Sequence, residues 1–203
     1  MTRLAEKIAV ITGGAGGIGQ AAARQFTAEG ARVVLVDREE AALQSVVRSL
    51  GEDVASYVVA DVTQPEQVQS YVNEAVQRWG GIDILLANAG IEGIVSPIPD
   101  YPVDMFEQVM AVNVRGVWLG LKYVIPVMRE RGGGSIVITS STAGIGGTAG
   151  MSAYTTSKHA VIGMMRTAAL ECAPMGIRVN TVNPAPIETR MMRSLEEMRV
   201  AAA

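Results

Sequence analysis

The chain has 203 residues, of which 49% are hydrophobic and 18% charged, and it carries a formal net charge of −3 at pH 7. This composition is typical of a compact globular protein and excludes an intrinsically disordered chain. The slightly acidic balance, without a basic stretch, argues against a nucleic-acid surface, so we expect no nucleic-acid partner. The length favours one substantial core over two, and we expect a single domain over residues 1–203.

Signals for membranes, secretion and disulfides are missing from the sequence. Its longest apolar runs, such as 8–11 and 82–87, are far too short to span a bilayer. The first residues lack the apolar core of a signal peptide. The single cysteine, Cys172, excludes a disulfide within the chain. We therefore expect a cytoplasmic protein with no membrane partner.

Short apolar runs alternate with longer amphipathic stretches along the chain. The runs predict strands at 7–12, 32–36, 55–60, 82–87, 135–140 and 177–182. The stretches between them predict helices at 18–29, 39–50, 65–79, 101–131 and 152–173, the fourth open to a kink at Pro126. Strands rich in Val and Ile without polar alternation are buried on both faces, and their alternation with helices implies parallel βαβ units. We predict an α/β fold: one doubly wound parallel sheet in a three-layer α/β/α domain.

A glycine-rich loop, Thr12–Gly19, joins the first predicted strand to the first predicted helix. Glycines let the backbone turn tightly and approach a pyrophosphate, and the helix N-terminus adds free N–H groups. A flexible turn is the simpler alternative, but the strand before it and the helix after it favour a dinucleotide site. Two patterns fit the loop: G-x-G-x-x-G through Gly14, Gly16 and Gly19, and T-G-x-x-x-G-x-G through Thr12, Gly13, Gly17 and Gly19.

An acidic residue, Asp37, closes the second predicted strand, 18 residues after Gly19. A carboxylate at this position can accept hydrogen bonds from both ribose hydroxyls of a dinucleotide and repels a 2′-phosphate. We therefore predict NAD as the cofactor. Arg38 follows directly and could pair with a 2′-phosphate, stack on adenine or stay solvated, so NADP remains the less favoured alternative.

Tyr154 and Lys158 are four residues apart, which places both side chains on one face of a helix. A free tyrosine has a pKa of about 10, and a nearby positive charge lowers it. The pair is a candidate general acid/base. Taken alone, the spacing also fits a surface tyrosine over a lysine stem; the glycine loop and the acidic strand end favour the catalytic interpretation.

The chain resembles the short-chain dehydrogenase/reductase family from Lys7 to about Met192. The resemblance lies in short motifs that keep the order of the family, each at a strand end or helix start. It implies a Rossmann-type fold and a hydride-transferring enzyme. The matching pieces are Thr12–Gly19, Asp61-Val62, Asn88-Ala89-Gly90, Asn113, Ser141, Tyr154 with Lys158, and Asn183-Pro184.

By this resemblance Ser141 holds the substrate oxygen, Tyr154 exchanges the proton, and Lys158 lowers the tyrosine pKa and binds the nicotinamide ribose. Asn113 would hold a relay water. Ser141 is chosen over Ser140 because it lies 13 residues before Tyr154, as in the family, which leaves Ser140 a structural hydroxyl. The implied cofactor contacts are Gly13, Ala15, Gly16, Gly17, Ile18, Gly19, Asp37, Arg38, Asp61, Val62, Asn88, Ala89, Gly90, Tyr154, Lys158, Pro184, Ile187 and Thr189.

These observations predict an NAD-dependent oxidoreductase acting on a small secondary alcohol or ketone. A 3-oxoacyl-carrier-protein reductase and a non-catalytic dinucleotide sensor are the alternatives. We expect pocket walls at 91–99, at 143–151 and after Thr189, all apolar or glycine-rich. The resemblance also implies a homodimer or homotetramer paired through the helices at 101–131 and 152–173. No metal site is expected, because His159 is the only histidine and has no Cys or His cluster beside it.

The C-terminal part departs from the family pattern. Family members usually continue for several dozen residues beyond this point, and Ala185 stands where glycine is common. From the sequence we expect the C-terminal part of the domain to be missing, with little to close a pocket over Tyr154.

Overall fold

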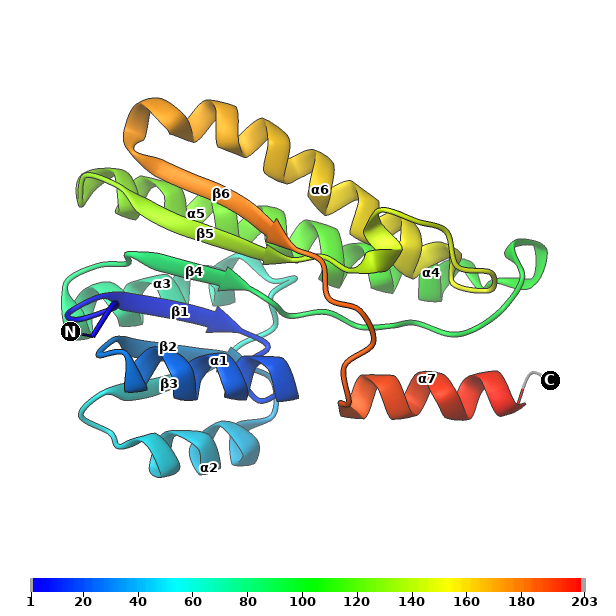
Figure 1. Cartoon of the computed structure of the whole chain (residues 1–203), viewed down its shortest axis with the longest axis horizontal. Coiled ribbons are helices and arrows are strands. Elements are labelled where there is room, and N and C mark those ends of the chain that lie inside the picture. Colours follow the sequence, from blue (N-terminus) through cyan, green and yellow to red (C-terminus); the bar gives the residue numbers. More distant parts are fainter. Residues whose placement is uncertain (1, 202–203) are drawn as a thin grey trace.

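The computed structural model describes residues 2–201, and within them six strands form one parallel sheet in the order β3-β2-β1-β4-β5-β6 (Figure 1). The order reverses between β1 and β4, which confirms the doubly wound prediction. Ala202 and Ala203, the end of the terminal alanine run, lie outside the described residues. The strands are β1 (Ile8–Thr12), β2 (Arg32–Asp37), β3 (Ala55–Val59), β4 (Ile84–Ala87), β5 (Gly134–Thr139) and β6 (Ile177–Val182).

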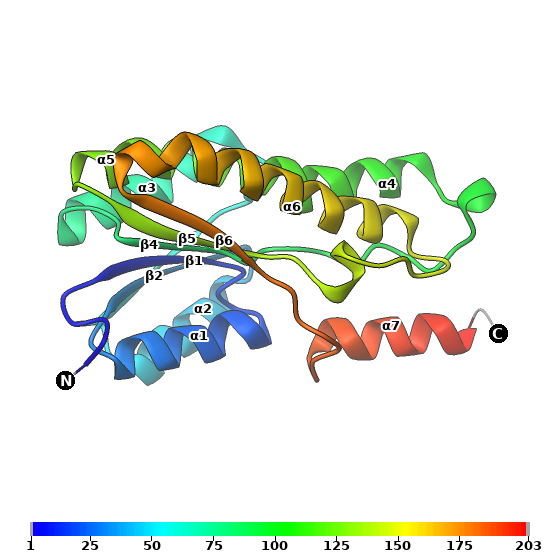
Figure 2. The same ribbon diagram turned by 45° about the horizontal axis from the view of Figure 1, so that its top comes forward.

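Helices cover both faces of the sheet, as Figure 2 shows. On one face lie α1 (Gly17–Ala28) and α2 (Glu40–Leu50); on the other lie α3 (Pro65–Trp79), α5 (Val117–Glu130) and α6 (Ser152–Cys172). None of the helices between residues 2 and 201 has the length and apolar character that crossing a membrane requires.

Each face of the sheet has its own hydrophobic core, and β1 contributes to both. Ile8 and Val10 pack with the helices α3, α5 and α6, whereas Ala9 and Ile11 pack with α1 and α2. Because successive side chains of a strand point to opposite faces, a strand buried on both faces must be apolar throughout. Each fully buried Val or Ile contributes about 1.5–3 kcal/mol. This is the physical reason why the apolar runs predicted the sheet.

The predicted helix at 101–131 is divided in the structure. It consists of α4 (Val103–Met110), a π-helical turn (Ala111–Gly116) and α5, which contains Pro126. Asn113 lies within the π-helical turn. Such turns are rare and occur frequently at functional sites, so this irregularity marks Asn113 for attention.

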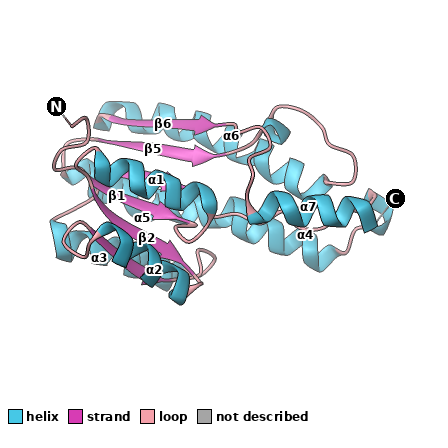
Figure 3. Cartoon of the chain, turned by 60° about the horizontal axis from the view of Figure 1, so that its bottom comes forward, coloured by secondary structure: helices cyan, strands magenta, loops and turns pink. Residues whose placement is uncertain are grey.

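A helix that the sequence analysis did not predict, α7 (Arg190–Ala201), follows the last strand. It lies beyond the carboxyl ends of the strands rather than on a face of the sheet (Figures 1 and 3). The spacing of Met191, Leu195 and Met198 is compatible with one face of a helix and was the available signal. The expectation that little covers the pocket is corrected below, since α7 supplies cover.

Candidate active site

The candidate site is a cavity of about 450 Å³ outside the carboxyl ends of the strands. It lies where the strand order reverses, the usual ligand position in this architecture. Of the site residues predicted from sequence, all line the cavity except Gly19 and Asn113. The volume lies within the range of typical ligand pockets, about 300–1,000 Å³.

The strand order divides the cavity into two ends. Asp37 ends β2, whereas Ser141 follows β5, and β1 and β4 lie between these strands. Neighbouring strands are about 4.8 Å apart, so three steps separate the two ends by roughly 14 Å. The glycine loop after β1 lies between them. The cavity therefore suits an elongated ligand whose two ends are recognised separately.

The glycine loop brings bare backbone to the middle of the cavity. Gly13 has a φ of +67°, in the left-handed region that favours glycine, and a Cβ there would lie 2.8 Å from Nδ2 of Asn88. Gly16 precedes the first residue of α1, whose first turn contains no acidic residue. The free N–H groups of this helix start attract an anion. The loop geometry therefore fits a pyrophosphate.

Gly19, unlike Gly13, Gly16 and Gly17 of the loop, lies outside the cavity wall. A Cβ on Gly19 would collide with the carbonyl oxygen of Gly13, and Gly19 itself is buried beneath the loop. It does not line the cavity. Gly19 thus permits the close packing of α1 under the loop.

Asp37 is held at the loop by two backbone groups. Its Oδ2 accepts a hydrogen bond from the N–H of Ala15 at 3.1 Å, and its Oδ1 accepts one from the N–H of Arg38 at 2.8 Å. A carboxylate has about four lone-pair sites, so each oxygen can accept a further hydrogen bond. Asp37 is thereby fixed in place with capacity left for ribose hydroxyls.

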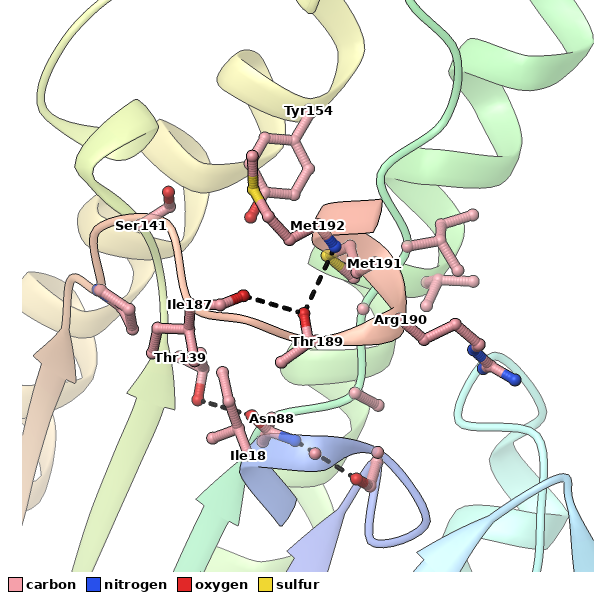
Figure 4. Close-up of a pocket in the computed structure, with 18 of the residues that line it drawn as sticks. Ile18, Asn88, Thr139, Ser141, Tyr154, Ile187, Thr189, Arg190, Met191 and Met192 are labelled. Carbon is pink, nitrogen blue, oxygen red and sulfur yellow. Dashed lines mark hydrogen bonds between the residues drawn. The ribbon is translucent and has the colours of Figure 1, made fainter. Parts of the chain in front are cut away.

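Polar side chains tie the ends of three strands together beneath the cavity. The Thr12 hydroxyl oxygen accepts hydrogen bonds from the N–H groups of Asn88 and Ala89 at 3.0 and 3.1 Å. Nδ2 of Asn88 donates to the Thr12 carbonyl at 3.1 Å. Thr139 donates to Oδ1 of Asn88 at 3.2 Å (Figure 4). The Asn88 side chain therefore links β1, β4 and β5. Thr139 was missed by the sequence analysis.

Ser141, Tyr154 and Lys158 meet at the other end of the cavity. The Ser141 hydroxyl oxygen accepts a hydrogen bond from the N–H of Ala143 at 3.1 Å, and both Ser141 and Tyr154 line the cavity. Lys158 Nζ donates to the Thr139 carbonyl at 2.9 Å and lies 5.4 Å from the centre of the Tyr154 ring. Ser140 is buried and donates to the Lys158 carbonyl, which is the geometry of a structural hydroxyl.

Burial shifts the pKa values of Tyr154 and Lys158 in opposite directions. Desolvation raises the pKa of Tyr154; the hydrogen bond with Ser141 lowers it and the charge of Glu92 raises it further. Burial also lowers the pKa of Lys158, to about 8. The expected lowering of the tyrosine pKa is therefore not produced by the protein's own side chains. The reason is that desolvation of the phenol has the largest effect on its pKa, while the Lys158 ammonium donates to the Thr139 carbonyl.

Asn113 lies behind the cavity rather than in its wall. Its Oδ1 accepts from the Ile91 N–H at 2.8 Å, and its Nδ2 donates to the Ile91 carbonyl at 2.9 Å and to Ser157 Oγ at 3.0 Å. Ser157 in turn donates to the Tyr154 carbonyl at 2.7 Å. The amide is thus engaged with protein groups, and its side chain connects the chain after β4 to the helix that carries Tyr154. Ser157 was not singled out in the sequence.

The segment after β6 forms a roof over the cavity. Thr189 accepts a hydrogen bond from the Met192 N–H at 3.3 Å and so caps the first turn of α7. Met191, Met192 and Leu195 of this helix line the cavity, and Leu195 is buried. In Figure 4 the Met192 side chain extends toward Tyr154. A cover over Tyr154 therefore exists within residues 2–201.

The residues that line the cavity fit a dinucleotide. A Cβ on Gly17 would point at the methyl group of Thr189, 3.1 Å away, so glycine keeps the passage between loop and roof open. In the part of the chain that the structure describes, no cluster of three or more His, Cys, Asp or Glu could hold a metal ion.

Comparisons with known proteins agree with this geometry. A family model described as short chain dehydrogenase matches residues 7–200. Levodione reductase from Leifsonia aquatica is 39% identical over 197 residues, which cover 95% of this chain and 74% of that protein. The crystal structure of levodione reductase has a TM-score of 0.90, covering 95% of this chain and 76% of that one.

Two further solved structures are similar. The 3-ketoacyl-(acyl-carrier-protein) reductase from Brucella melitensis, complexed with NADH, has a TM-score of 0.92 at 33% identity and covers 98% of this chain and 83% of that one. NAD+-bound xylitol dehydrogenase has a TM-score of 0.88 at 39% identity and covers 91% and 73%. The chain therefore belongs to the short chain dehydrogenase family, and it is an oxidoreductase that transfers a hydride between a nicotinamide dinucleotide and an alcohol or ketone.

Proposed function

We propose that this chain, as one domain over residues 1–203, is an NAD-dependent dehydrogenase or ketone reductase for a modestly apolar secondary alcohol or its ketone. A single observation carries the proposal: one cavity is lined at one end by Asp37 and at the other by Ser141, Tyr154 and Lys158. The first end distinguishes cofactors, and the second contains the proton-transferring groups.

The cofactor would lie along the cavity from Asp37 to Tyr154. Asp61 and Val62 line the end near Asp37 and would hold the adenine. The glycine loop and α1 would hold the pyrophosphate. The remaining proposed contacts for the nicotinamide half are Asn88, Ala89, Gly90, Pro184, Ile187 and Thr189, all of which line the cavity. When bound, the nicotinamide supplies or accepts the hydride.

The protein's own groups position the substrate and move its proton. Ser141 and Tyr154 would both hydrogen-bond the substrate oxygen, because both side chains line the same end of the cavity. Tyr154 would donate a proton to this oxygen in reduction and accept one in oxidation. Since burial raises its pKa, the phenol is protonated at neutral pH, which suits reduction directly. Lys158, paired with Thr139, would bind the nicotinamide ribose, and the Asn113 amide would act by positioning α6.

Asp37 supports NAD over NADP. Its carboxylate would accept the ribose hydroxyls and repel a 2′-phosphate. Arg38 also lines the cavity and is the residue through which NADP would be accepted. The similarity to NADH-bound and NAD+-bound proteins favours NAD but leaves the preference to experiment.

The substrate end of the cavity is mostly apolar. Ile91, Met151, Met191, Met192 and Leu195 line the cavity, and Met192 extends toward Tyr154. Two of the predicted wall segments, 91–99 and 143–151, contribute through Ile91, Ala143, Thr148 and Met151. Such a wall favours cyclic or aromatic secondary alcohols and ketones over charged substrates.

The decisive assay measures kcat/KM with NADH and NADPH against cyclic ketones, aromatic ketones and 3-oxoacyl thioesters. We expect turnover of the first two classes with NADH, at least tenfold above NADPH. A preference for acyl thioesters would support the alternative that the Brucella structure favours, a 3-oxoacyl reductase. Cofactor binding without turnover of any substrate would contradict both and indicate a non-catalytic dinucleotide sensor.

Assembly and location also remain proposals. Phe106 on α4, Trp118 on α5 and Leu170 on α6 are exposed apolar side chains on the helices predicted to pair subunits. We therefore expect a homodimer or homotetramer, and a sedimentation experiment that finds only monomer would contradict it. A cytoplasmic location stays a prediction.

A further inference from the structure

The first turn of α7 presents side chains of unlike chemistry to the two halves of the cavity. Arg190, Met191 and Met192 are consecutive, and all three line the cavity. Figure 4 shows Met192 extending toward Tyr154, whereas the Arg190 side chain extends away from Tyr154. Successive helical residues project about 100° apart, so one turn can serve both halves. The methionines belong to the substrate end; Arg190 does not.

The side chain of the residue before Arg190 lies beside the start of α1. Thr189, the residue before it, is the neighbour that a Cβ on Gly17 would meet, at 3.1 Å. Gly17 is the first residue of α1 and part of the glycine loop. The roof therefore meets the glycine loop at the position proposed for the pyrophosphate. Arg190 is the next residue along the chain after this contact.

The Arg190 guanidinium is uncommitted within the described part of the chain. Arg193, one helical turn later, pairs with Glu188 at 2.5 Å, whereas Arg190 makes no side-chain hydrogen bond, ion pair or ring contact among residues 2–201. It is exposed and yet lines the cavity. A guanidinium presents five N–H donors in a planar fork that matches phosphate oxygens. A guanidinium that lines this cavity without a protein partner is available to an anionic ligand.

We propose that Arg190 binds the pyrophosphate of the dinucleotide from the roof side, opposite the glycine loop. This inference rests on the proposed function, because it takes the cavity to be the cofactor site. The cofactor phosphates would then be held between the N–H groups at the start of α1 and a cation at the start of α7. Arg190 acts in binding and has no part in proton transfer.

The test measures NADH binding by fluorescence titration for wild type, Arg190→Gln and Arg190→Lys, with Arg193→Gln as the matched control. A charge-assisted hydrogen bond corresponds to roughly a tenfold change in affinity. We expect Arg190→Gln to weaken NADH binding about tenfold and Arg190→Lys less. Arg193→Gln should bind within twofold of wild type, because that arginine lies outside the cavity. The difference in NADH affinity between wild type and Arg190→Gln should decrease as the salt concentration rises.

A parallel titration with NADPH separates the two kinds of phosphate. Equal losses for NADH and NADPH in Arg190→Gln support the pyrophosphate contact. A loss confined to NADPH assigns the arginine to the 2′-phosphate and overturns the proposal. Unchanged binding of both cofactors also overturns it, provided that circular dichroism and melting temperature match wild type. If wild type itself binds neither cofactor, the proposed function fails instead, so the two failures are distinguishable.

Discussion

The floor and the roof of the cavity are built differently. The floor, at the ends of β1, β4 and β5, is cross-linked by Thr12, Asn88 and Thr139 and contains the buried Lys158. The roof, from Pro184 through α7, has most of its side chains exposed and is fixed by few hydrogen bonds. A tightly bonded floor holds reacting groups in place, as proton transfer requires. A loosely bonded roof can adapt to the ligand, so we expect the two regions to control different kinetic parameters.

Among the variants that test this difference between floor and roof, we expect Tyr154→Phe to have the largest effect on turnover. General acid/base catalysis contributes about 10²–10⁴-fold, so the variant should lose turnover by about 10³-fold and keep NADH affinity within a few-fold. Because burial raises the pKa of Tyr154, the phenol stays protonated to higher pH. Wild-type ketone reduction should therefore be nearly flat from pH 6 to 8, while alcohol oxidation rises with pH.

The control for this variant is Tyr57→Phe. Tyr57 is on β3, and its hydroxyl contacts Gln44 and Glu40 outside the cavity. It should retain wild-type kcat. A Tyr154→Phe enzyme with wild-type kcat in both directions would remove the tyrosine from the chemistry and leave the floor without its proton-transferring group.

The sequence predicted the floor well because its residues are fixed by local rules. Parallel strands buried on both faces must be apolar, and ligands lie beyond their carboxyl ends, so polar residues and glycines just after the runs mark the site. Asp37, Asn88 and Ser141 each follow this rule, and all line the cavity. The glycine pattern also has a direct steric cause at Gly13 and Gly19.

The features that the sequence did not predict depend on contacts between distant residues. Asn113 meets Ile91 across 22 positions and Ser157 across 44, and no local pattern reports such distances. The π-helical turn depends on i→i+5 bonding that helix periodicity does not reveal. The raised pKa of Tyr154 follows from its burial, which is set by the folded surroundings. The roof helix was missed because only its spacing of Met and Leu indicated it.

An intermediate effect is expected for Asn113→Ala, which removes hydrogen bonds to Ile91 in the cavity wall and to Ser157 on α6. The change leaves the Ile91 backbone groups and the Ser157 hydroxyl without the partners they have now, and an unsatisfied buried polar group costs about 1–3 kcal/mol. We expect a loss of roughly 2–4 kcal/mol in the free energy of unfolding, measured by urea denaturation, and a lower kcat with a smaller change in KM.

The control for that loss is Asn73→Ala on the exposed face of α3. Alanine is the better helix former, so this variant should be neutral or slightly stabilised. Equal stabilities of the two variants would mean that the Asn113 contacts do not support the floor. A normal kcat in a destabilised Asn113→Ala protein would mean that Asn113 stabilises the fold but does not position the reacting groups.

The smallest effect is expected from the roof, with Met192→Ala. The methionine lines the substrate end and extends toward Tyr154 (Figure 4), so its removal should weaken apolar substrate contacts. Losing three heavy atoms, Cγ, Sδ and Cε, at a partly exposed site corresponds to roughly 1 kcal/mol, or about fivefold in KM for a cyclic ketone. NADH affinity and kcat should stay within twofold, because the floor is untouched. Met198→Ala, on the same helix but outside the cavity, should leave KM unchanged. If Met192→Ala instead lowers kcat as strongly as a floor variant, the roof takes part in positioning the reacting groups, and the division between an adaptable roof and a fixed floor does not hold.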